Sequence, residues 1–374
     1  MADNYSNRIE RLRNRRRGVN EIYAMDEALA SRQVLLEKSA QQESWENRAS
    51  GKSATKYALG AMQEVDPVYT RVSIDTAKRI ENQLTDRLNR KDITTSFRLQ
   101  GSVPLNIHIK GVSDVDILAI DEQIFMSDIN GIKNHTYTPS DKNSLDVILA
   151  LRTEIEDSLA SAFPTATVHT DNAKSVKITG GSLARDVDVV PAVWWNNVKY
   201  QMSDRETDRG VTILNKKTFE RINNTPFLHI ELITDRCGRT SGGLRKSIRL
   251  LKNIKADSAA EGNEIGLSSF DIASIMYHAN VNNLGQGIYY ELAILGETQR
   301  WLDWLWKNYE QARNLDVPDQ TRKIFDNDDK KDELGKLSYQ VDKLVLAVAY
   351  EIAGLSGSDE VNENIRNHVN KSTF

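Results

Sequence analysis

The sequence contains very little cysteine and no long apolar segment. Of its 374 residues, one is cysteine (Cys237) and seven are proline. A single cysteine excludes an internal disulfide and is typical of a reducing compartment, so we expect a cytoplasmic protein. No apolar run approaches the roughly 18 residues that span a bilayer. The arginine-rich first twenty residues also lack the apolar centre of a secretory signal. We therefore expect no association with a membrane.

The chain also lacks an excess of basic charge and any grouping of histidines. Its formal net charge is −4, which argues against a protein that coats nucleic acid with its whole surface. The six histidines are scattered, with no HExxH motif and no Cys/His cluster, so a structural zinc site is not expected. Apolar residues make up 39% and charged residues 27%, as in an ordinary globular protein. The length leaves room for two lobes with a sizeable core.

A pair of aspartates beside a predicted turn is the most informative feature present. Apolar alternation before residue 100 predicts a strand that leads into Gly101-Ser102, where backbone can approach a phosphate closely. Asp114 and Asp116 open a second predicted strand, and alternation places both carboxylates on one face. Such carboxylates repel each other unless a cation lies between them, and Mg²⁺ prefers oxygen ligands of this kind. The combination predicts a metal-dependent site for nucleoside triphosphates.

A second Asp-x-Asp lies in the most strand-like part of the chain. Gly180-Gly181 predicts a hairpin turn, and Asp186 and Asp188 then lie on one face of a strand that runs to Pro191. From the pattern alone, either aspartate could be a third carboxylate. If this strand lies beside that of Asp116, the ligand set for two cations is complete.

Apolar periodicity predicts helices at 1–45, 73–88, 144–163 and 341–353, a polar irregular loop at 124–138, and mainly helical structure after residue 205. Ser268 and Asp271, three residues apart, are typical of a capping pair at a helix N-terminus, and free N–H groups there can also bind an anion. Gly354 is expected to end the last long helix, and the segment after 356 reads as a polar tail.

Two groups of basic residues have a structural and a functional interpretation. The arginines within 13–17 are most simply read as a solvated helix face, with contact to a phosphate backbone as the minority view. The predicted helix after Gly242-Gly243 places Arg245, Arg249 and Lys252 in one narrow stripe. Solvent exposure is the simpler interpretation of that stripe as well.

Several motifs occur together in a recognisable order. They are Tyr57–Gln63 with Asp66-Pro67, Gly101-Ser102, Ile109-Lys110-Gly111 leading to Ser113–Asp116, Asp188–Ala192, and Leu250–Lys252 followed by Leu267–Phe270. In this order they resemble the bacterial members of the cyclic GMP-AMP synthase and oligoadenylate synthetase superfamily. These are the CD-NTases, the cyclic-oligonucleotide synthases of CBASS anti-phage systems. The resemblance covers about residues 55 to 300.

The resemblance implies an α+β protein with a polymerase-β-like nucleotidyltransferase fold. A small mixed β-sheet with flanking helices would be joined to a helical C-terminal lobe, with the active site between them. The expected division is 1–205 for the N-terminal helices and catalytic lobe, 206–355 for the helical lobe that closes the nucleotide cleft, and 356–374 for the polar tail.

The resemblance also assigns roles to individual residues. It implies two Mg²⁺ ions, with Mn²⁺ as a substitute, on the catalytic and metal-binding residues Asp114, Asp116 and Asp188. Asp188 is preferred to Asp186 because the Asp-Val-Val-Pro-Ala run matches the family strand. The residues expected to hold the donor triphosphate are Gly101, Ser102, Lys252 and Ser269.

The leading functional hypothesis is a Mg²⁺-dependent nucleotidyltransferase that makes a cyclic di- or trinucleotide second messenger from NTPs, releasing pyrophosphate, in anti-phage defence. Its partners would be the NTP substrates, a downstream CBASS effector reached through the product, and a regulatory protein or ligand. The zinc-binding insertion of the animal DNA sensor is absent, so activation by DNA is doubtful. Two alternatives stay open: a nucleotidyltransferase that acts on RNA or another macromolecule, and a catalytically silent nucleotide-binding protein on the same fold.

Overall fold

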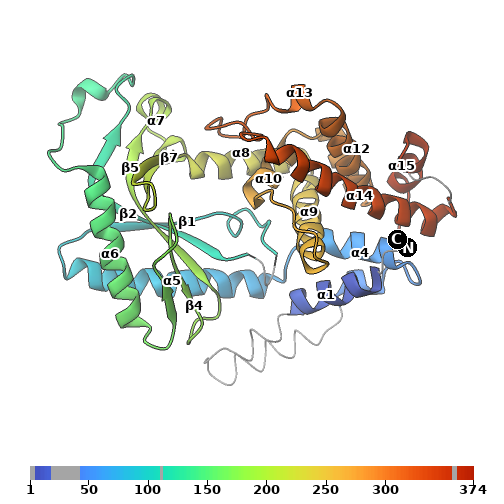
Figure 1. The fold of residues 1–374 in the computed structure, drawn as a ribbon, viewed down its shortest axis with the longest axis horizontal. Helices are drawn as coiled ribbons and strands as arrows, with labels where there is room; N and C mark the ends of the chain where they lie inside the picture. Colours follow the sequence, from blue (N-terminus) through green and yellow to red (C-terminus); the bar gives the residue numbers. More distant parts are fainter. Residues whose placement is uncertain (1–4, 18–42, 110–112, 356–359) are drawn as a thin grey trace.

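A computed structural model describes residues 5–17, 43–109, 113–355 and 360–374. The chain forms a lobe built on a mixed sheet and a helical lobe beside it, with both ends of the chain at the helical lobe (Figure 1). This architecture confirms the predicted α+β class. Within the described ranges, no helix is long and apolar enough to cross a membrane.

The sheet has seven strands, in the path β1-β2-β5-β4-β3 with β6 on β5 and β7 on β6. Their bounds are β1 Thr95–Gln100, β2 Val115–Ser127, β3 Thr167–His169, β4 Val176–Thr179, β5 Val187–Asn196, β6 Gly210–Asn215 and β7 Glu220–Asn224. Among the strands of the described residues, β2 and β5 run parallel and the other pairs are antiparallel. The connection between these two parallel strands carries α6 (Ser144–Ala162), as a parallel pair requires.

Two strands run further than we predicted. β2 continues through Ser127, so only the later part of 124–138 is irregular, with a short helical turn, η2, at Asn134–Thr136. β5 continues past Pro191 to Asn196. The proline is tolerated because β4 pairs with β5 only as far as Val189 and β6 begins pairing at Ala192. Pro191, which has no N–H to donate, therefore lies where β5 changes its neighbour.

Helices cover one face of the sheet and the other face is left for the site. α5 (Pro67–Asn89) and α6 pack against β1, β2, β4 and β5 through a core that includes Ile80, Leu84, Ile155, Ile117 and Val189. The opposite face carries Leu118 and Val190 in a smaller core closed by Phe227. The helices expected at 73–88 and 144–163 are both present, but the first begins earlier than predicted, at Pro67.

Contrary to the prediction from the sequence, the chain does not become helical directly after residue 205. After α7 (Val198–Ser203) and a single turn, η3 (Glu206–Asp208), the chain returns to the sheet as β6 and β7. β6 is too short to show an alternating pattern, but its Val-Thr-Ile core favours a strand. The catalytic lobe thus extends to Asn224, and the helical lobe begins with α8 (Pro226–Arg239).

The helices of the second lobe pack around one large apolar core. Its remaining elements are α9 Gly243–Ala260, α10 Ser269–Tyr277, α11 Val281–Gly285, η4 Gln286–Ile288, α12 Ala293–Lys307, α13 Tyr309–Ala312, α14 Asp329–Ala353 and α15 Glu363–Asn370. Ser268 and Asp271 form the predicted capping box, and Gly354 ends α14 in a left-handed conformation (φ 64°). The expected polar tail contains α15, whose Ile365 and Val369 are buried against the lobe.

The N-terminal helices belong to this core and not to the catalytic lobe. α1 (Tyr5–Arg17) and α4 (Ser53–Met62) share one apolar cluster with α9 and α14. Of the helix predicted at 1–45, residues 18–42 lie outside the described part, and a short helical turn, η1, spans Ser44–Asn47. The basic run is not simply solvated: the arginines that pair with Glu46, Asp257 and Glu43 are Arg13, Arg15 and Arg16.

Candidate active site

Strand register brings two of the predicted carboxylates side by side. Asp116 on β2 lies opposite Asp188 on the parallel strand β5, and Lys177 on β4 lies opposite Asp188 from the other side. Both aspartates alternate with Val115, Ile117, Val187 and Val189, which are buried under α5 and α6. Their side chains therefore point from the opposite face of the sheet.

Hydrogen bonds and ion pairs connect members of the acidic row, by which we mean Asp114, Asp116, Asp186 and Asp188. Nζ of Lys177 lies 2.6 Å from Oδ2 of Asp114, just before β2, and 3.9 Å from Oδ2 of Asp186. The hydroxyl of Ser175 donates to Oδ1 of Asp188 at 2.6 Å. Asp188 thus lies within β5 beside Asp116, whereas Asp186 lies before the strand begins.

The acidic row carries more negative charge than its surroundings neutralise. Burial, followed by the carboxylates of Asp188 and Asp114, raises the pKa of Asp116 to about 7. Burial also raises the pKa of Asp188, and the neighbouring carboxyl of Asp114 adds to the increase while Ser175 opposes it. A group of acids that resists ionisation in this way favours a bound cation.

A glycine turn passes directly over Asp116. Gly101 has φ +73°, a left-handed conformation that side chains other than glycine rarely adopt. A Cβ at this position would lie 2.1 Å from Oδ2 of Asp116. Glycine is required here both by the backbone and by the space. Ser102 follows and lines the same cavity as the carboxylate.

Two cations of α9, in the helical lobe, contact the segment that follows the glycine turn. Nζ of Lys252 donates to the carbonyl of Ile107 at 3.0 Å and to Oγ of Ser113 at 3.1 Å. The guanidinium of Arg249 donates to the carbonyls of Met62 and Asn106. Both side chains are about 4% exposed, so the solvated interpretation of the basic stripe is wrong for them. Burial lowers the pKa of Lys252 to about 8, against the opposing charge of Asp116.

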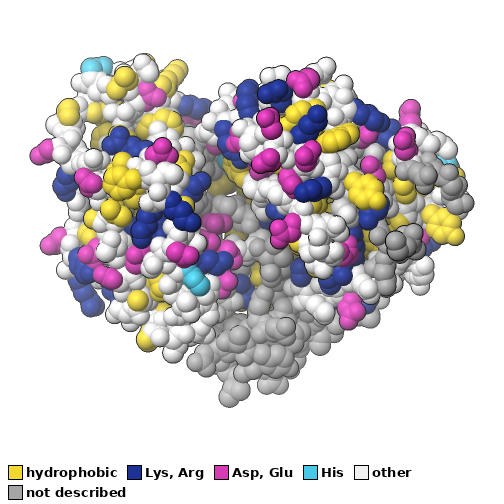
Figure 2. Space-filling view, viewed as in Figure 1, with side chains coloured by type: hydrophobic (Ala, Val, Ile, Leu, Met, Phe, Trp, Pro, Cys, Tyr) yellow, Lys and Arg dark blue, Asp and Glu magenta, His cyan; other side chains and the backbone are white. Residues whose placement is uncertain are grey.

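A cavity of about 670 Å³ joins these groups between the lobes. Figure 2 shows the surface hollowed there, with acidic side chains beside the hollow. Six of the seven predicted site residues line the cavity: Gly101, Ser102, Asp114, Asp116, Lys252 and Ser269. Asp188 lies behind Asp116 in the next strand. Ser269 is the first residue of α10, so the free N–H groups of that helix start at the cavity.

Comparison with known proteins identifies the family to which the chain belongs. Residues 231–346 match the model of the cGAS/DncV-like nucleotidyltransferase C-terminal helical domain. Over 359 residues the chain is 52% identical to the cyclic dinucleotide synthase CdnE of Yersinia aleksiciae, covering 94% of this chain and 93% of that protein. The chain belongs to the bacterial CD-NTase family. It is therefore a nucleotidyltransferase.

Solved structures of other CD-NTases share its fold. The STING-associated CdnE c-di-GMP synthase of Capnocytophaga granulosa has a TM-score of 0.67 and 29% identity, over 91% of this chain and 97% of that one. The corresponding synthase from Flavobacteriaceae sp. has a TM-score of 0.71 at 24% identity, over 92% and 98% of the two chains, and shows the fold alone. The sheet and helical lobe predicted from the sequence are thus those of this family.

The acidic row of this CD-NTase has the chemistry of a divalent-cation site. Within the described residues, no group of three or more Asp, Glu, His or Cys side chains is placed to hold a metal ion. The carboxylate of Asp114 pairs with the ammonium of Lys177. The donor set itself is suitable: hard carboxylate oxygens, buried and mutually repelling, next to a nucleotide-sized cavity.

Sequence reasoning did not find several residues of this CD-NTase site. Lys177 occurs in a short strand whose register with β5 cannot be read from the sequence. The cavity wall on the helical lobe is formed partly by His229, Phe270, Asp319 and Arg322. The only sequence signal for any of these was the Ser268-Ser269-Phe270 stretch, because the others are brought together by loops and helix packing.

Proposed function

We propose that this CD-NTase joins two NTPs into a cyclic dinucleotide second messenger, with a cyclic trinucleotide as the larger possibility for the same chemistry. In each step a ribose hydroxyl oxygen bonds to the α-phosphorus of an NTP, and the bond from that phosphorus to the bridging oxygen breaks, so pyrophosphate leaves. A second transfer within the linear product closes the ring. The observation that carries the proposal is the row of Asp116 and Asp188 under the Gly101 turn.

The chain's own groups can hold the triphosphate in that reaction. Lys252 faces the cavity beside Ser113, and its ammonium would meet phosphate oxygens at the mouth of the glycine turn. Ser102 offers a hydroxyl, and Ser269 together with the first N–H groups of α10 offers donors from the opposite lobe. A triphosphate bridging the two lobes would be positioned with its α-phosphorus near the carboxylates. Positioning and charge neutralisation supply most of the rate in such transfers.

Asp114, Asp116 and Asp188 would hold two Mg²⁺ ions, or Mn²⁺ as a substitute. When bound, such ions lower the pKa of an attacking hydroxyl and stabilise charge on the departing pyrophosphate. The hydrogen bond from Ser175 fixes the carboxylate of Asp188 and favours its ionised form. All three acidic positions are intact, which supports an active enzyme over a silent nucleotide-binding protein.

The similarity to a cyclic dinucleotide synthase over nearly the whole length supports a two-nucleotide ring. Because the Capnocytophaga granulosa relative is STING-associated, we propose that the product of this chain acts on a separate effector protein. The setting would be a CBASS-type anti-phage system, in which the enzyme works in the cytoplasm. A regulatory protein or ligand would then control when synthesis starts.

The decisive experiment is to incubate the purified chain with all four labelled NTPs and Mg²⁺ or Mn²⁺, followed by phosphatase. Phosphatase-resistant cyclic products identified by mass spectrometry, together with stoichiometric pyrophosphate, are the expected result. The Asp116→Asn and Asp188→Asn variants are the matched controls and should yield none. No resistant product under any base mixture would refute the proposal, and label transferred to added RNA would favour the macromolecular alternative.

A further inference from the structure

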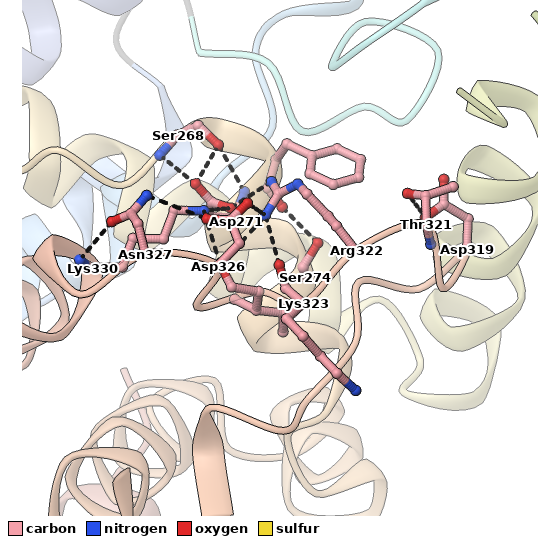
Figure 3. A network of polar contacts seen from close by, with 12 residues as sticks. Ser268, Asp271, Ser274, Asp319, Thr321, Arg322, Lys323, Asp326, Asn327 and Lys330 are labelled. Atoms are coloured by element: carbon pink, nitrogen blue, oxygen red, sulfur yellow. Dashed lines mark hydrogen bonds and ion pairs between the residues drawn. The ribbon is translucent and has the colours of Figure 1, made fainter. Parts of the chain in front are cut away.

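The two walls of the nucleotide cavity are held in place by different kinds of contact. On the helical lobe, Oδ1 of Asp271 accepts from Arg322 at 2.7 Å and from Lys330 at 2.9 Å, which fixes the first turn of α10 beside the cavity (Figure 3). On the catalytic lobe, the glycine turn continues into residues 102–109, and this segment contains His108. The histidine takes no part in the phosphate contacts described above, so its place beside the turn has another cause.

His108 is a buried imidazole between α5 and the glycine turn. The residue is 1% exposed. Its Nε2 lies 3.0 Å from the hydroxyl oxygen of Thr70 on α5. Its ring stacks on that of Tyr69, also on α5, with ring centres 6.2 Å apart and planes inclined by 15°. The helix thus fixes the imidazole through one nitrogen and one face.

The surroundings of His108 keep its ring neutral. Burial, followed by the positive charges of Lys252 and Arg249 on α9, lowers the pKa of His108 to about 4. The charge of Arg185 adds to this decrease, and the backbone of Ser102 opposes it. Near pH 7 the imidazole therefore has one nitrogen that donates and one that accepts, and the hydrogen bond made by one nitrogen decides the role of the other.

Nδ1 is the ring nitrogen that remains for the glycine turn. It is sealed from solvent and has no hydrogen-bond partner among the described residues, and a buried polar atom in that state costs free energy. The carbonyl oxygen of Ser102 accepts from the N–H of Ile107 at 3.1 Å and has a second lone pair. Because a carbonyl can only accept, a bond to it requires the proton on Nδ1. Nε2 must then accept from the hydroxyl of Thr70.

We propose that His108 is a positioning residue whose Nδ1–H closes on the carbonyl of Ser102 when a triphosphate occupies the turn, with Thr70 fixing the ring in that tautomer. The contact links α5 to the residue whose hydroxyl faces the phosphates. A neutral ring suits this place, because a charged imidazole would repel Lys252, the cation that meets the phosphates in the proposed reaction. The role rests on the proposed function, since it concerns the turn that holds the donor triphosphate.

The tautomer can be measured without reference to turnover. In protein labelled with nitrogen-15 histidine, long-range proton–nitrogen spectra show which ring nitrogen carries the proton. The signals of His108 are those missing from the spectrum of His108→Asn. We expect the proton on Nδ1 in the wild type, and a shift of the Nδ1 signal when non-hydrolysable ATP or GTP analogues bind. A proton on Nε2, or an Nδ1 signal that does not respond to either analogue, would overturn the proposal.

Three substitutions separate positioning from packing. His108→Asn keeps an N–H near the place of Nδ1, His108→Gln keeps a polar group near the place of Nε2, and His108→Leu keeps neither. We expect His108→Leu to lower kcat at least about tenfold with a smaller change in KM, because a displaced turn misplaces the α-phosphorus. His108→Asn should recover to within about threefold of the wild type, since its amide restores the bond to Ser102. Equal kcat values for His108→Leu and His108→Asn would show that the ring only fills space.

A second histidine provides the matched control. Nε2 of His169 also lies 3.0 Å from a threonine hydroxyl oxygen, that of Thr179, but this pair joins β3 to β4 and does not line the cavity. His169→Leu should therefore leave kcat unchanged. Thr70→Val should lower kcat in the wild type but not in His108→Leu, because the two residues act as one unit. Additive losses would contradict this.

The two proposals fail in different ways. Cyclic product from a protein whose His108 carries its proton on Nε2 would overturn the positioning role and leave the synthase intact. An Nδ1 signal that shifts with the nucleotide analogues, in a protein that makes no cyclic product, would support the positioning role and refute the synthase.

Discussion

The ammonium of Lys177 lies 2.6 Å from the carboxylate of Asp114, across the strand that carries Asp188. The two side chains are 28% and 35% exposed, so solvent reaches the pair from the cavity side. The lysine supplies positive charge to an acidic row that otherwise repels itself. A divalent cation held by the carboxylate of Asp114 would therefore have to displace this ammonium.

If Lys177 competes with a cation, its removal should tighten metal binding. For Lys177→Gln we expect the affinity for Mn²⁺ to rise about two- to fivefold, since a partly exposed ion pair contributes up to about 1 kcal/mol. Mn²⁺ binding followed by electron paramagnetic resonance measures this without reference to turnover. Lys174→Gln, an exposed neighbour, is the control. Unchanged or weaker binding in Lys177→Gln would contradict the competition.

The stability of the metal-free protein should fall as the pH rises. Burial and the two neighbouring carboxylates raise the pKa of Asp116 from 3.8 to about 7. The folded state thus keeps a proton that the unfolded chain releases, so stability is lost as pH rises between these two values. Melting temperatures measured in chelator should decline from pH 4 to pH 7.5 in the wild type. In Asp116→Asn the decline should be shallower.

The Asp116→Asn variant should also lose catalytic activity. Removing the charge of Asp116 should lower kcat at least about a hundredfold, or roughly 3 kcal/mol of transition-state stabilisation. Asp141→Asn, at an exposed position, should behave as the wild type in both assays. A pH-stability profile for Asp116→Asn as steep as that of the wild type would show that another group titrates.

Two glycines with nearly the same backbone provide a matched pair. Gly101 and Gly180 have φ values of +73° and +72°, but a Cβ at Gly180 would meet nothing within 4 Å. Gly180→Ala should cost only the strain of a left-handed alanine, roughly 1 kcal/mol, and keep its activity. Gly101→Ala carries the same strain and also collides with Asp116. We expect it to lose at least a hundredfold in kcat/KM, and equal activity of the two variants would contradict this.

A buried carboxylate fastens the N-terminal helix to the helical lobe. Asp257 is fully buried and accepts from Tyr57 at 2.6 Å, from Arg15 at 2.8 Å and from Arg11 at 2.9 Å. Asp257→Ala would leave the buried hydroxyl of Tyr57 and the partly buried guanidinium of Arg15 without this partner, so we expect about 1.5–3 kcal/mol of lost stability. Chemical denaturation measures the loss, with exposed Glu10→Gln as the control. A loss below 1 kcal/mol would show that α1 is held mainly by its apolar face.

The sequence predicted those helices and caps whose own residues show a regular apolar spacing or a typical end residue. The helices at 67–89 and 144–162, the capping box of Ser268 and the left-handed Gly354 follow from periodicity and end chemistry confined to a few residues. β7 escaped prediction because Ile222 is its only apolar side chain, and β6 because Val211, Ile213 and Leu214 do not alternate strictly with polar residues. The basic stripe was misread for a related reason: helical spacing places Arg249 and Lys252 on one side but cannot say what covers them.

The sequence alone determined which chemistry is present: carboxylates in two Asp-x-Asp pairs, a Gly-Ser turn and the order of motifs that marks a CD-NTase. These are properties of neighbouring residues, so they survive without any knowledge of the fold. Only the tertiary structure decided that Asp188 lies beside Asp116, that Lys177 reaches Asp114, and that His229 and Asp319 share a cavity wall. Strand register and the packing of two lobes depend on contacts between residues tens to hundreds of positions apart, and no local pattern encodes them.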